Sequence, residues 1–165
     1  MNTLEINGWK IFFHQCFLEQ ITELVTTVKK LKISDPNGYK KKNATKLLTA
    51  IKKVIEERIA KNPLDPIFHQ GNTLGPNNKH WFRAKFLQQF RLFFRCSEEH
   101  KIIVIGWVND FNTLRAYDSK SDAYKIFSSK LKAGKPPNDW QTLLKEASMT
   151  TTALDTHSIQ DLFNH

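Results

Sequence analysis

The stretch WFRAKFLQQFRLFFR, residues 81–95, decides the fold because large apolar and cationic side chains alternate along it. Successive side chains of a β-strand point to opposite faces of a sheet, so a period of two predicts strands at 81–86 and 90–95. We expect these strands to pair in an antiparallel meander. The side chains that would face the core are Phe82, Ala84, Phe86, Phe90, Leu92 and Phe94.

The opposite face of this strand pair is basic. Residues 66–97 contain no Asp or Glu. Antiparallel pairing brings Arg83, Lys85 and Arg91 onto one face, because paired strands lie only about 4.8 Å apart. Like charges held so close destabilise a sheet face unless solvent, a phosphate or an acidic partner compensates them. The pattern predicts an anion site, with ordinary solvated strand residues as the alternative. The cations of this window, which we call the basic strip, are Lys79, Arg83, Lys85, Arg91 and Arg95.

The whole chain shares this excess of positive charge. It has 165 residues, 25 Lys plus Arg against 16 Asp plus Glu, and a net charge of +9. A basic protein attracts polyanions, so nucleic acid is the expected partner, ahead of an acidic protein or a membrane surface. The sequence has neither a membrane-spanning apolar run nor a signal-peptide pattern, which predicts a cytoplasmic protein with no membrane contact. Cys16 and Cys96 are expected to be small buried thiols.

Two amphipathic helices are predicted before the basic strip. A short strand at 7–15, opened by Asn-Gly, leads into a helix that ends at SDPNG, 34–38. The second helix carries an apolar stripe and ends at NPLDP, 62–66. The two helices should form a hairpin with a basic polar face, since nine lysines and one acid lie between Leu24 and Ile55. We interpret these lysines as a solvated face rather than a specific site.

The remaining elements follow the basic strip. KIIVIGWVN, 101–109, is apolar on both faces and predicts a central strand. A third helix should begin at an N-cap of Ser119 or Ser121 and end at Gly134, and DWQTLLKEA, 139–147, predicts a fourth. The fold class is therefore α+β, with a single domain over 1–147 and a polar, loosely held tail over 148–165.

Several long motifs, in order over about residues 5–145, resemble the YhaV toxin family of type II toxin–antitoxin systems. They include INGWKIFFHQCF (6–17), GWVNDFNTLRAY (106–117) and SDAYKIF (121–127). That family looks like a member of the RelE/ParE superfamily, whose fold is a small twisted antiparallel sheet against an N-terminal helical hairpin. The resemblance implies a growth-arresting endoribonuclease that acts on translated mRNA at the ribosome. It also implies a PrlF-type antitoxin with an AbrB-like part, through which alone DNA would be contacted.

The resemblance also implies site residues. RelE-type nucleases use two basic residues, two apart on one strand, and an arginine on the next strand; Arg83, Lys85 and Arg91 match that pattern. The superfamily's C-terminal tyrosine, which contacts the substrate base, matches either Tyr117 or Tyr124. Where the superfamily has a further basic residue near the end of the last strand, this chain has Asn109-Asp110-Phe111. The expected substrate contacts are Trp81, Arg95, Arg115, Tyr117, Tyr124 and Asp110.

Metal-free RNA cleavage assigns different tasks to these residues. The 2′-hydroxyl attacks the adjacent phosphorus, which requires deprotonation of that hydroxyl, neutralisation of the phosphorane charge and protonation of the 5′-oxygen. Arginine suits only the neutralisation because its guanidinium stays protonated. Lys85 is the first candidate for proton transfer and Asp110 the second. No metal-ligand spacing or glycine-rich phosphate loop occurs in the sequence, so we expect no metal and no cofactor.

Other residues keep two interpretations. Trp81 and Trp107 would suit base stacking, although large aromatic residues among strands are more often core. His80 is expected at the periphery of the site. The histidines expected to be loop, turn or packing residues are His14, His69 and His100.

The sequence alone leaves two other functions open. One is a non-catalytic basic RNA- or DNA-binding module, and the other is a ParE-like or degenerate toxin that acts by protein binding.

Overall fold

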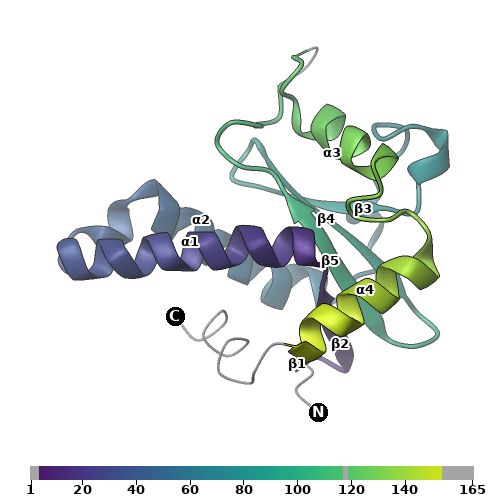
Figure 1. Ribbon diagram of the computed structural model, residues 1–165, viewed down its shortest axis with the longest axis horizontal. Coiled ribbons are helices and arrows are strands. Elements are labelled where there is room, and N and C mark those ends of the chain that lie inside the picture. Colours follow the sequence, from purple (N-terminus) through teal and green to yellow (C-terminus); the bar gives the residue numbers. More distant parts are fainter. Residues whose placement is uncertain (1–3, 117–118, 154–165) are drawn as a thin grey trace.

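Four of the five cations of the basic strip lie on two neighbouring strands, β3 and β4, at one edge of a five-stranded sheet with the order β1-β2-β5-β4-β3 (Figure 1). The computed structural model describes residues 4–116 and 119–153. Helices pack on both faces of the sheet, so the predicted α+β class is confirmed. The strands are β1 (Leu4–Ile6), β2 (Trp9–Phe13), β3 (Phe82–Phe86), β4 (Phe90–Ser97) and β5 (Ile102–Val108).

The predicted meander is confirmed. Strand β4 pairs antiparallel with both β3 and β5. The register places Arg83 opposite Phe93 and Lys85 opposite Arg91. Directly opposed residues of an antiparallel pair share a face, so Arg83, Lys85 and Arg91 lie on one face of the sheet, as predicted.

The N-terminal strands correct two expectations. The sheet is mixed rather than wholly antiparallel, because β2 pairs with β5 in parallel. Asn7 and Gly8 close a hairpin between β1 and β2 instead of merely opening a strand, and both have positive φ, 53° and 81°. Side-chain periodicity fixes which face a residue occupies but not the direction of its neighbour, so the parallel pairing could not be predicted from it.

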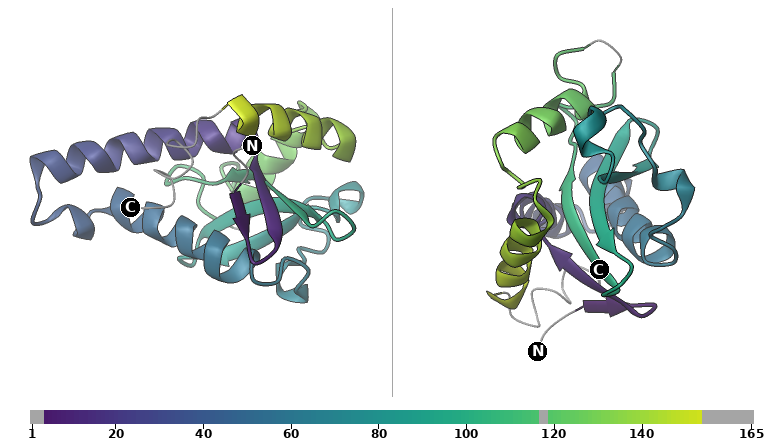
Figure 2. Two further views of the ribbon diagram at one scale, coloured as in Figure 1. Left: turned by 90° about the horizontal axis from the view of Figure 1, so that it is seen from below. Right: turned by 90° about the vertical axis from the view of Figure 1, so that its right-hand side faces the viewer.

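Helices α1 (Gln15–Ser34) and α2 (Asn43–Lys53) form the predicted hairpin and project from one face of the sheet (Figures 1 and 2). The 3₁₀ turn η1 (Tyr39–Lys41) joins them. One feature was not predicted: α2 continues as a π-helical turn, η2 (Val54–Ile59). The buried side chains along the inside of the hairpin are Ile21, Val25, Val28, Leu47, Leu48 and Ile51.

Helices α3 (Ala123–Lys132) and α4 (Trp140–Ala153) cover the other face. The N-cap of α3 is Asp122, not Ser119 or Ser121. The Asp122 carboxylate accepts from the Tyr124 amide, which neither serine does, so the predicted cap was wrong by at least one residue. Gly134 ends α3 as predicted, with φ of 75°.

The C-terminal boundary also differs from the prediction. Helix α4 runs to Ala153, past the predicted end at Ala147. The last part of the predicted tail, 154–165, lies outside the described residues. Within the residues that are described, no helix is both long enough and apolar enough to cross a membrane.

The core beneath α3 is a stack of aromatic rings. The Phe127 ring centroid lies 4.2 Å from that of Phe93 and 5.6 Å from that of Trp107, in stacked geometry. Trp81 meets Phe127 edge-on at 5.1 Å. Gly106 lies under this stack, and a Cβ atom there would approach the Trp81 ring to 2.7 Å. Only glycine fits at this position without moving the ring.

Substituting Gly106 with alanine is therefore expected to lower the free energy of unfolding by about 1–3 kcal/mol, as overpacked cores do. Urea unfolding measures the loss. The double variant Gly106→Ala/Trp81→Phe is the control, because the smaller ring relieves the clash. Its loss should be smaller than the sum of the two single losses. Additive losses would show that the added methyl group does not press on Trp81.

Candidate active site

The basic face of β3 and β4 meets the start of α3 at a single hydroxyl group. The Tyr124 oxygen accepts a hydrogen bond from Nε of Arg83 at 3.0 Å and from Nε of Arg91 at 3.2 Å. Two guanidinium groups from adjacent strands are thus fixed side by side. We call Arg83, Arg91 and Tyr124 the arginine–tyrosine cluster.

Backbone carbonyls hold the far sides of both guanidinium groups. Nη1 of Arg91 donates to the carbonyls of Gln88 (2.8 Å) and Phe90 (2.9 Å), and Nη1 of Arg83 donates to that of Ile67 (2.9 Å). The Arg91 side chain is buried, with Arg91 only 8% exposed. These bonds fix the direction of each fork, and a preorganised fork suits an anion with several oxygen atoms.

No carboxylate compensates this charge in the part of the chain that the structure describes. Neither Arg83 nor Arg91 has an ion pair there, and neither does Lys85, which is exposed opposite Arg91 on β3. A buried charge without a counter-ion is costly, so a bound anion would stabilise the arrangement. The interpretation as an anion site is thereby favoured over ordinary solvated strand residues.

Arg115 and Asp122 support the cluster from the loop that follows β5. The Arg115 guanidinium lies 4.7 Å from the centre of the Tyr124 ring and donates to Asp122 Oδ1 at 2.6 Å. Asp122 also accepts from the amides of Ala116 (2.8 Å) and Tyr124 (3.1 Å). Burial alone would raise the pKa of Asp122, but the hydrogen bonds from Arg115 and these amides outweigh it and lower the pKa below its ordinary value. Arg115 therefore orients Tyr124, and its charge is balanced by Asp122.

A pH dependence follows for Asp122. Because its pKa is lower in the folded state, its ionised carboxylate stabilises the fold above the unfolded pKa of about 3.9. That contribution is lost as pH falls through the folded pKa. Asp122→Asn should lower stability at neutral pH and flatten the acid limb of the stability–pH curve. Asp122→Ala should lose about 0.5–2 kcal/mol for the missing N-cap as well. Urea unfolding across pH tests this, and acid limbs of equal slope would contradict it.

Asn109 is a site residue that sequence reasoning missed. It is 1% exposed, and its Oδ1 accepts from the Arg91 amide at 2.7 Å. Its Nδ2 donates to the carbonyls of Gln89 and Thr113, each at 2.9 Å. One amide side chain thereby ties the end of β5 to the β3–β4 turn and to the loop that carries Arg115. The available signal was its position, directly after the apolar central strand, where the superfamily has a basic residue.

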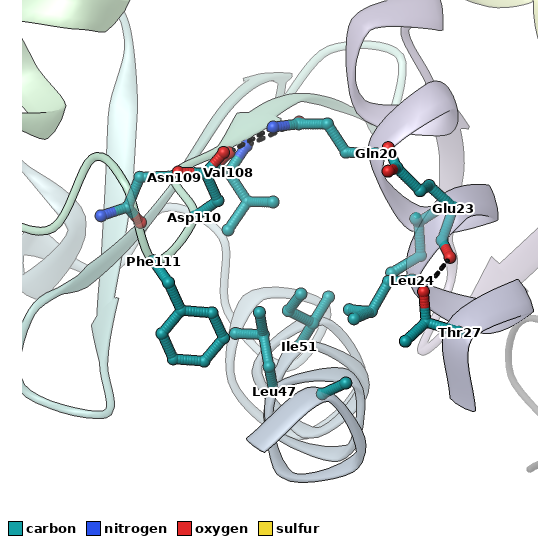
Figure 3. Close-up of a pocket in the computed structure, with 12 residues that line it drawn as sticks. Gln20, Glu23, Leu24, Thr27, Leu47, Ile51, Val108, Asn109, Asp110 and Phe111 are labelled. Atoms are coloured by element: carbon teal, nitrogen blue, oxygen red, sulfur yellow. Dashed lines mark hydrogen bonds between the residues drawn. The ribbon is translucent and has the colours of Figure 1, made fainter. Parts of the chain in front are cut away.

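Asp110 does not reach the cluster. Its Oδ1 accepts from the Asn112 amide (2.8 Å) and from the Thr113 hydroxyl (3.0 Å). It lines a pocket of about 260 Å³ between α1, α2 and the end of β5, where Phe111 faces Leu47 and Ile51 (Figure 3). The geometry does not support Asp110 as a general base for chemistry at Arg83 and Arg91.

Trp81 and Trp107 belong to the core, which was the second interpretation of these residues. Trp81 is fully buried, and its Nε1 donates to Asn138 Oδ1 at 2.9 Å. Arg95 donates to the Asn138 carbonyl at 2.7 Å and lies near the rings of Trp81 (5.8 Å) and Trp140 (5.1 Å). Burial lowers the pKa of Arg95 to about 10. The buried Trp81 ring has no face exposed to a substrate, and Arg95 is held by Asn138 and Trp140 rather than by the arginine–tyrosine cluster.

The structure describes only one of the two candidate tyrosines. Tyr117 lies outside the described residues. The Tyr124 ring is buried between Arg115 and Phe93, which it meets in T-shaped geometry, so it presents a hydroxyl group rather than a free face. The geometry at Tyr124 therefore suits a hydrogen bond to a substrate and not stacking on a base.

His14 and His80 have the structural roles expected of them, but the two cysteines are half-buried rather than buried. His14 caps α1, accepting from the Cys16 amide at 3.1 Å, and pairs with Glu146 at 3.0 Å. His80 contacts Asn138 at the periphery, and burial lowers its pKa. Cys16 and Cys96 are free thiols, and burial raises the pKa of Cys96 to about 11. Over 4–116 and 119–153, no three His, Cys, Asp or Glu side chains are grouped so that they could hold a metal ion.

Comparison with known proteins identifies the family to which the chain belongs. The YhaV toxin family model, described as a toxin with endonuclease activity of a toxin–antitoxin system, matches residues 11–148. The chain belongs to the YhaV toxin family. It is 51% identical over 147 residues to the ribonuclease toxin YhaV of Escherichia coli K12, covering 88% of this chain and 96% of that protein. It is also 51% identical over 143 residues to the toxin YhaV of Escherichia coli O6:H1, covering 86% and 93% of the two chains. No solved structure matches.

The match to the YhaV family covers all the parts that form the cluster. Strands β3 and β4, the loop with Arg115 and helix α3 all fall within residues 11–148. As a member of a toxin–antitoxin family, the chain has an antitoxin as its implied partner. The family expected from the motifs is therefore confirmed.

Proposed function

We propose that this chain is an endoribonuclease toxin that binds the scissile phosphate of mRNA at the arginine–tyrosine cluster. The observation that carries the proposal is the pair of guanidinium groups fixed by one hydroxyl, with no carboxylate paired to them among the described residues. The endonuclease activity described for the family and the relative named as a ribonuclease support it.

The cluster suits a reaction in which the 2′-hydroxyl attacks the adjacent phosphorus. Arg83 and Arg91 would neutralise the charge that develops on the phosphorane oxygens. The Tyr124 oxygen accepts from both Nε atoms, which leaves its own proton to donate to a phosphate oxygen. Lys85, exposed beside Arg91, is the group we assign to proton transfer at the 5′-oxygen. We propose that this chemistry needs no metal ion.

The biological setting forms part of the same proposal. We infer a RelE-like fold, action on translated mRNA at the ribosome in the cytoplasm, and neutralisation by a PrlF-type antitoxin. The helical hairpin against a small sheet supports the fold assignment, and the sequence motifs support the rest. DNA would be contacted only through the antitoxin.

Cleavage by the purified protein tests the proposal. RNA is incubated in EDTA, with and without translating ribosomes, and the new 5′ ends are identified as hydroxyl or phosphate. We expect 5′-hydroxyl ends from the wild type and none from Arg83→Ala. Lys132→Ala, which removes an exposed lysine of α3, is the control and should cleave normally. Intact RNA in every condition, with binding retained, would indicate a non-catalytic RNA-binding module; growth arrest without cleavage would indicate a protein-binding toxin.

A further inference from the structure

The α1–α2 hairpin carries a second concentration of positive charge, away from the arginine–tyrosine cluster. Between Leu24 and Ile55 there are nine lysines and one acid. That acid, Asp35, is engaged locally, since its carboxylate accepts from the Gly38 amide at 3.0 Å. The exposed lysines without an ion pair among the described residues are Lys30, Lys32, Lys40, Lys41, Lys42, Lys46 and Lys53.

Charge is also segregated along the hairpin. Helix α1 has about 1.5 Å of rise per residue, so its 20 residues extend roughly 30 Å from the sheet. The acidic side chains Glu19, Glu23, Glu56 and Glu57 lie toward its base, in the first half of α1 and in η2. Seven of the nine lysines lie toward its tip, which projects beyond the sheet (Figures 1 and 2), whereas Lys52 and Lys53 lie in the last turn of α2, next to η2. The outer end of the hairpin therefore presents a concentrated positive field, with Asp35 as its one acid and the other acids near the base.

The repulsion between these closely spaced lysines destabilises the hairpin, and a bound anion would offset that loss of stability. Three consecutive lysines, Lys40 to Lys42, occupy the tip, and Lys42 and Lys46 lie four residues apart at the start of α2. Like charges at this spacing destabilise a helix. The apolar faces of α1 and α2 already pack against each other and the sheet. The packing of the hairpin therefore does not explain why its solvent-exposed face is so rich in lysine.

The composition of the tip indicates which polyanion it fits. The centres of protein–protein interfaces are depleted in lysine and enriched in aromatic residues, whereas phosphate backbones attract lysine. Ile33 is the exposed large apolar side chain of the hairpin. Tyr39 is the one aromatic residue between Leu24 and Ile55, and it packs against the core, so the tip has no platform on which unpaired bases could stack. A regular phosphate backbone matches this surface better than an acidic protein or a single strand does.

We infer that the tip of the α1–α2 hairpin binds the phosphate backbone of folded, double-helical RNA, without reading its sequence. The inference rests on the proposed function in one respect: it adds a docking contact to an RNA-cutting toxin. The arginine–tyrosine cluster lies on the face covered by α3, while the hairpin covers the other face. A folded RNA held by the hairpin therefore leaves the cluster open to an unpaired strand.

Binding of a fluorescent RNA duplex, which offers no unpaired strand to cut, tests the hairpin directly. Anisotropy is measured over a range of salt concentrations for the wild type and for Lys40→Gln/Lys41→Gln/Lys42→Gln. Each lost phosphate contact reduces the slope of log K against log salt by about 0.7–0.9, so the triple variant should lose about two to three. We expect its affinity to fall by at least about tenfold near 0.1 M salt.

The control removes the same charge elsewhere, at Lys132, Lys135 and Lys145, which are exposed on and after α3 and on α4. Lys132→Gln/Lys135→Gln/Lys145→Gln should keep the wild-type slope. Equal slopes for the two triple variants would overturn the inference. So would a loss seen only with poly-L-glutamate, because that result would assign the tip to an acidic protein.

Cleavage of a short single-stranded oligonucleotide separates this inference from the proposed function. The hairpin variant should cut it at the wild-type rate, because the arginine–tyrosine cluster is untouched. If no protein cuts either the oligonucleotide or mRNA on translating ribosomes, the proposed function fails while duplex binding still decides the role of the hairpin. Unfolding temperatures within a few degrees of wild type, by circular dichroism, confirm that both triple variants are folded.

Discussion

Arg91→Ala is expected to reduce the rate of RNA cleavage by about 10²–10³-fold, the usual effect of removing one preorganised donor from a site of developing negative charge. Arg91 is the most buried cation of the cluster, and two backbone carbonyls and Tyr124 fix its orientation. Its contribution is greatest in the transition state, so kcat should fall more than KM rises. Single-turnover cleavage of a labelled RNA measures the effect.

Two further variants test whether the contribution of Arg91 to cleavage depends on its geometry or on its charge alone. Arg91→Lys keeps the charge but cannot bond Tyr124 and both carbonyls at once, so most of the activity should still be lost. Lys79→Ala removes an exposed cation of the basic strip that lies outside the cluster, and it should cleave like the wild type. If Arg91→Lys retained full activity, charge alone would suffice. If Lys79→Ala matched Arg91→Ala, the whole strip would act as a diffuse basic surface.

Trp81→Ala is expected to lower the free energy of unfolding by about 3–5 kcal/mol, the usual cost of truncating a large buried aromatic residue. The indole is fully buried, packs edge-on against Phe127 and donates to Asn138. Its removal leaves a cavity beneath α3 and takes one of two hydrogen-bonding contacts from Asn138 Oδ1, which also contacts His80. Urea unfolding at constant pH, with the slope of the transition checked against wild type, measures the loss.

The same substitution distinguishes the two interpretations of Trp81. Trp81→Phe keeps most of the packing and loses the hydrogen bond, so its loss of stability should be much smaller. A core role predicts that RNA binding by the folded fraction is unchanged in both variants. Stable variants with weakened RNA binding would instead show that this ring contacts bases.

The face of the sheet that carries the cations could be predicted because the period of two along a strand determines which side chains share a face. Alternation along 81–95 determines that Arg83, Lys85 and Arg91 share a face once the strands pair, and the observed register agrees. Helical periodicity likewise predicted α1, α2 and α3 with ends close to those observed. These are local properties of the chain, and the hydrophobic pattern encodes them directly.

The features that organise the site depend on contacts between distant segments. Tyr124 is 41 residues from Arg83, and nothing in the pattern around either residue indicates that they touch. The direction of β2 beside β5 is equally hidden, because parallel and antiparallel neighbours need the same apolar faces. Asn109 is recognisable as a site residue only once its three hydrogen-bonded partners have been brought together.

The shared hydroxyl of Tyr124 also determines when the site comes into existence during synthesis. A ribosome makes both arginines before it makes Tyr124, and the loop with Arg115 falls between them in the chain. A nascent chain that ends before α3 therefore contains the cations without the group that aligns them. We expect the toxin to be inactive as a partial product and to gain activity only once α3 has docked. The time between synthesis of the arginines and docking of α3 is an interval in which an antitoxin can bind the chain before it becomes active.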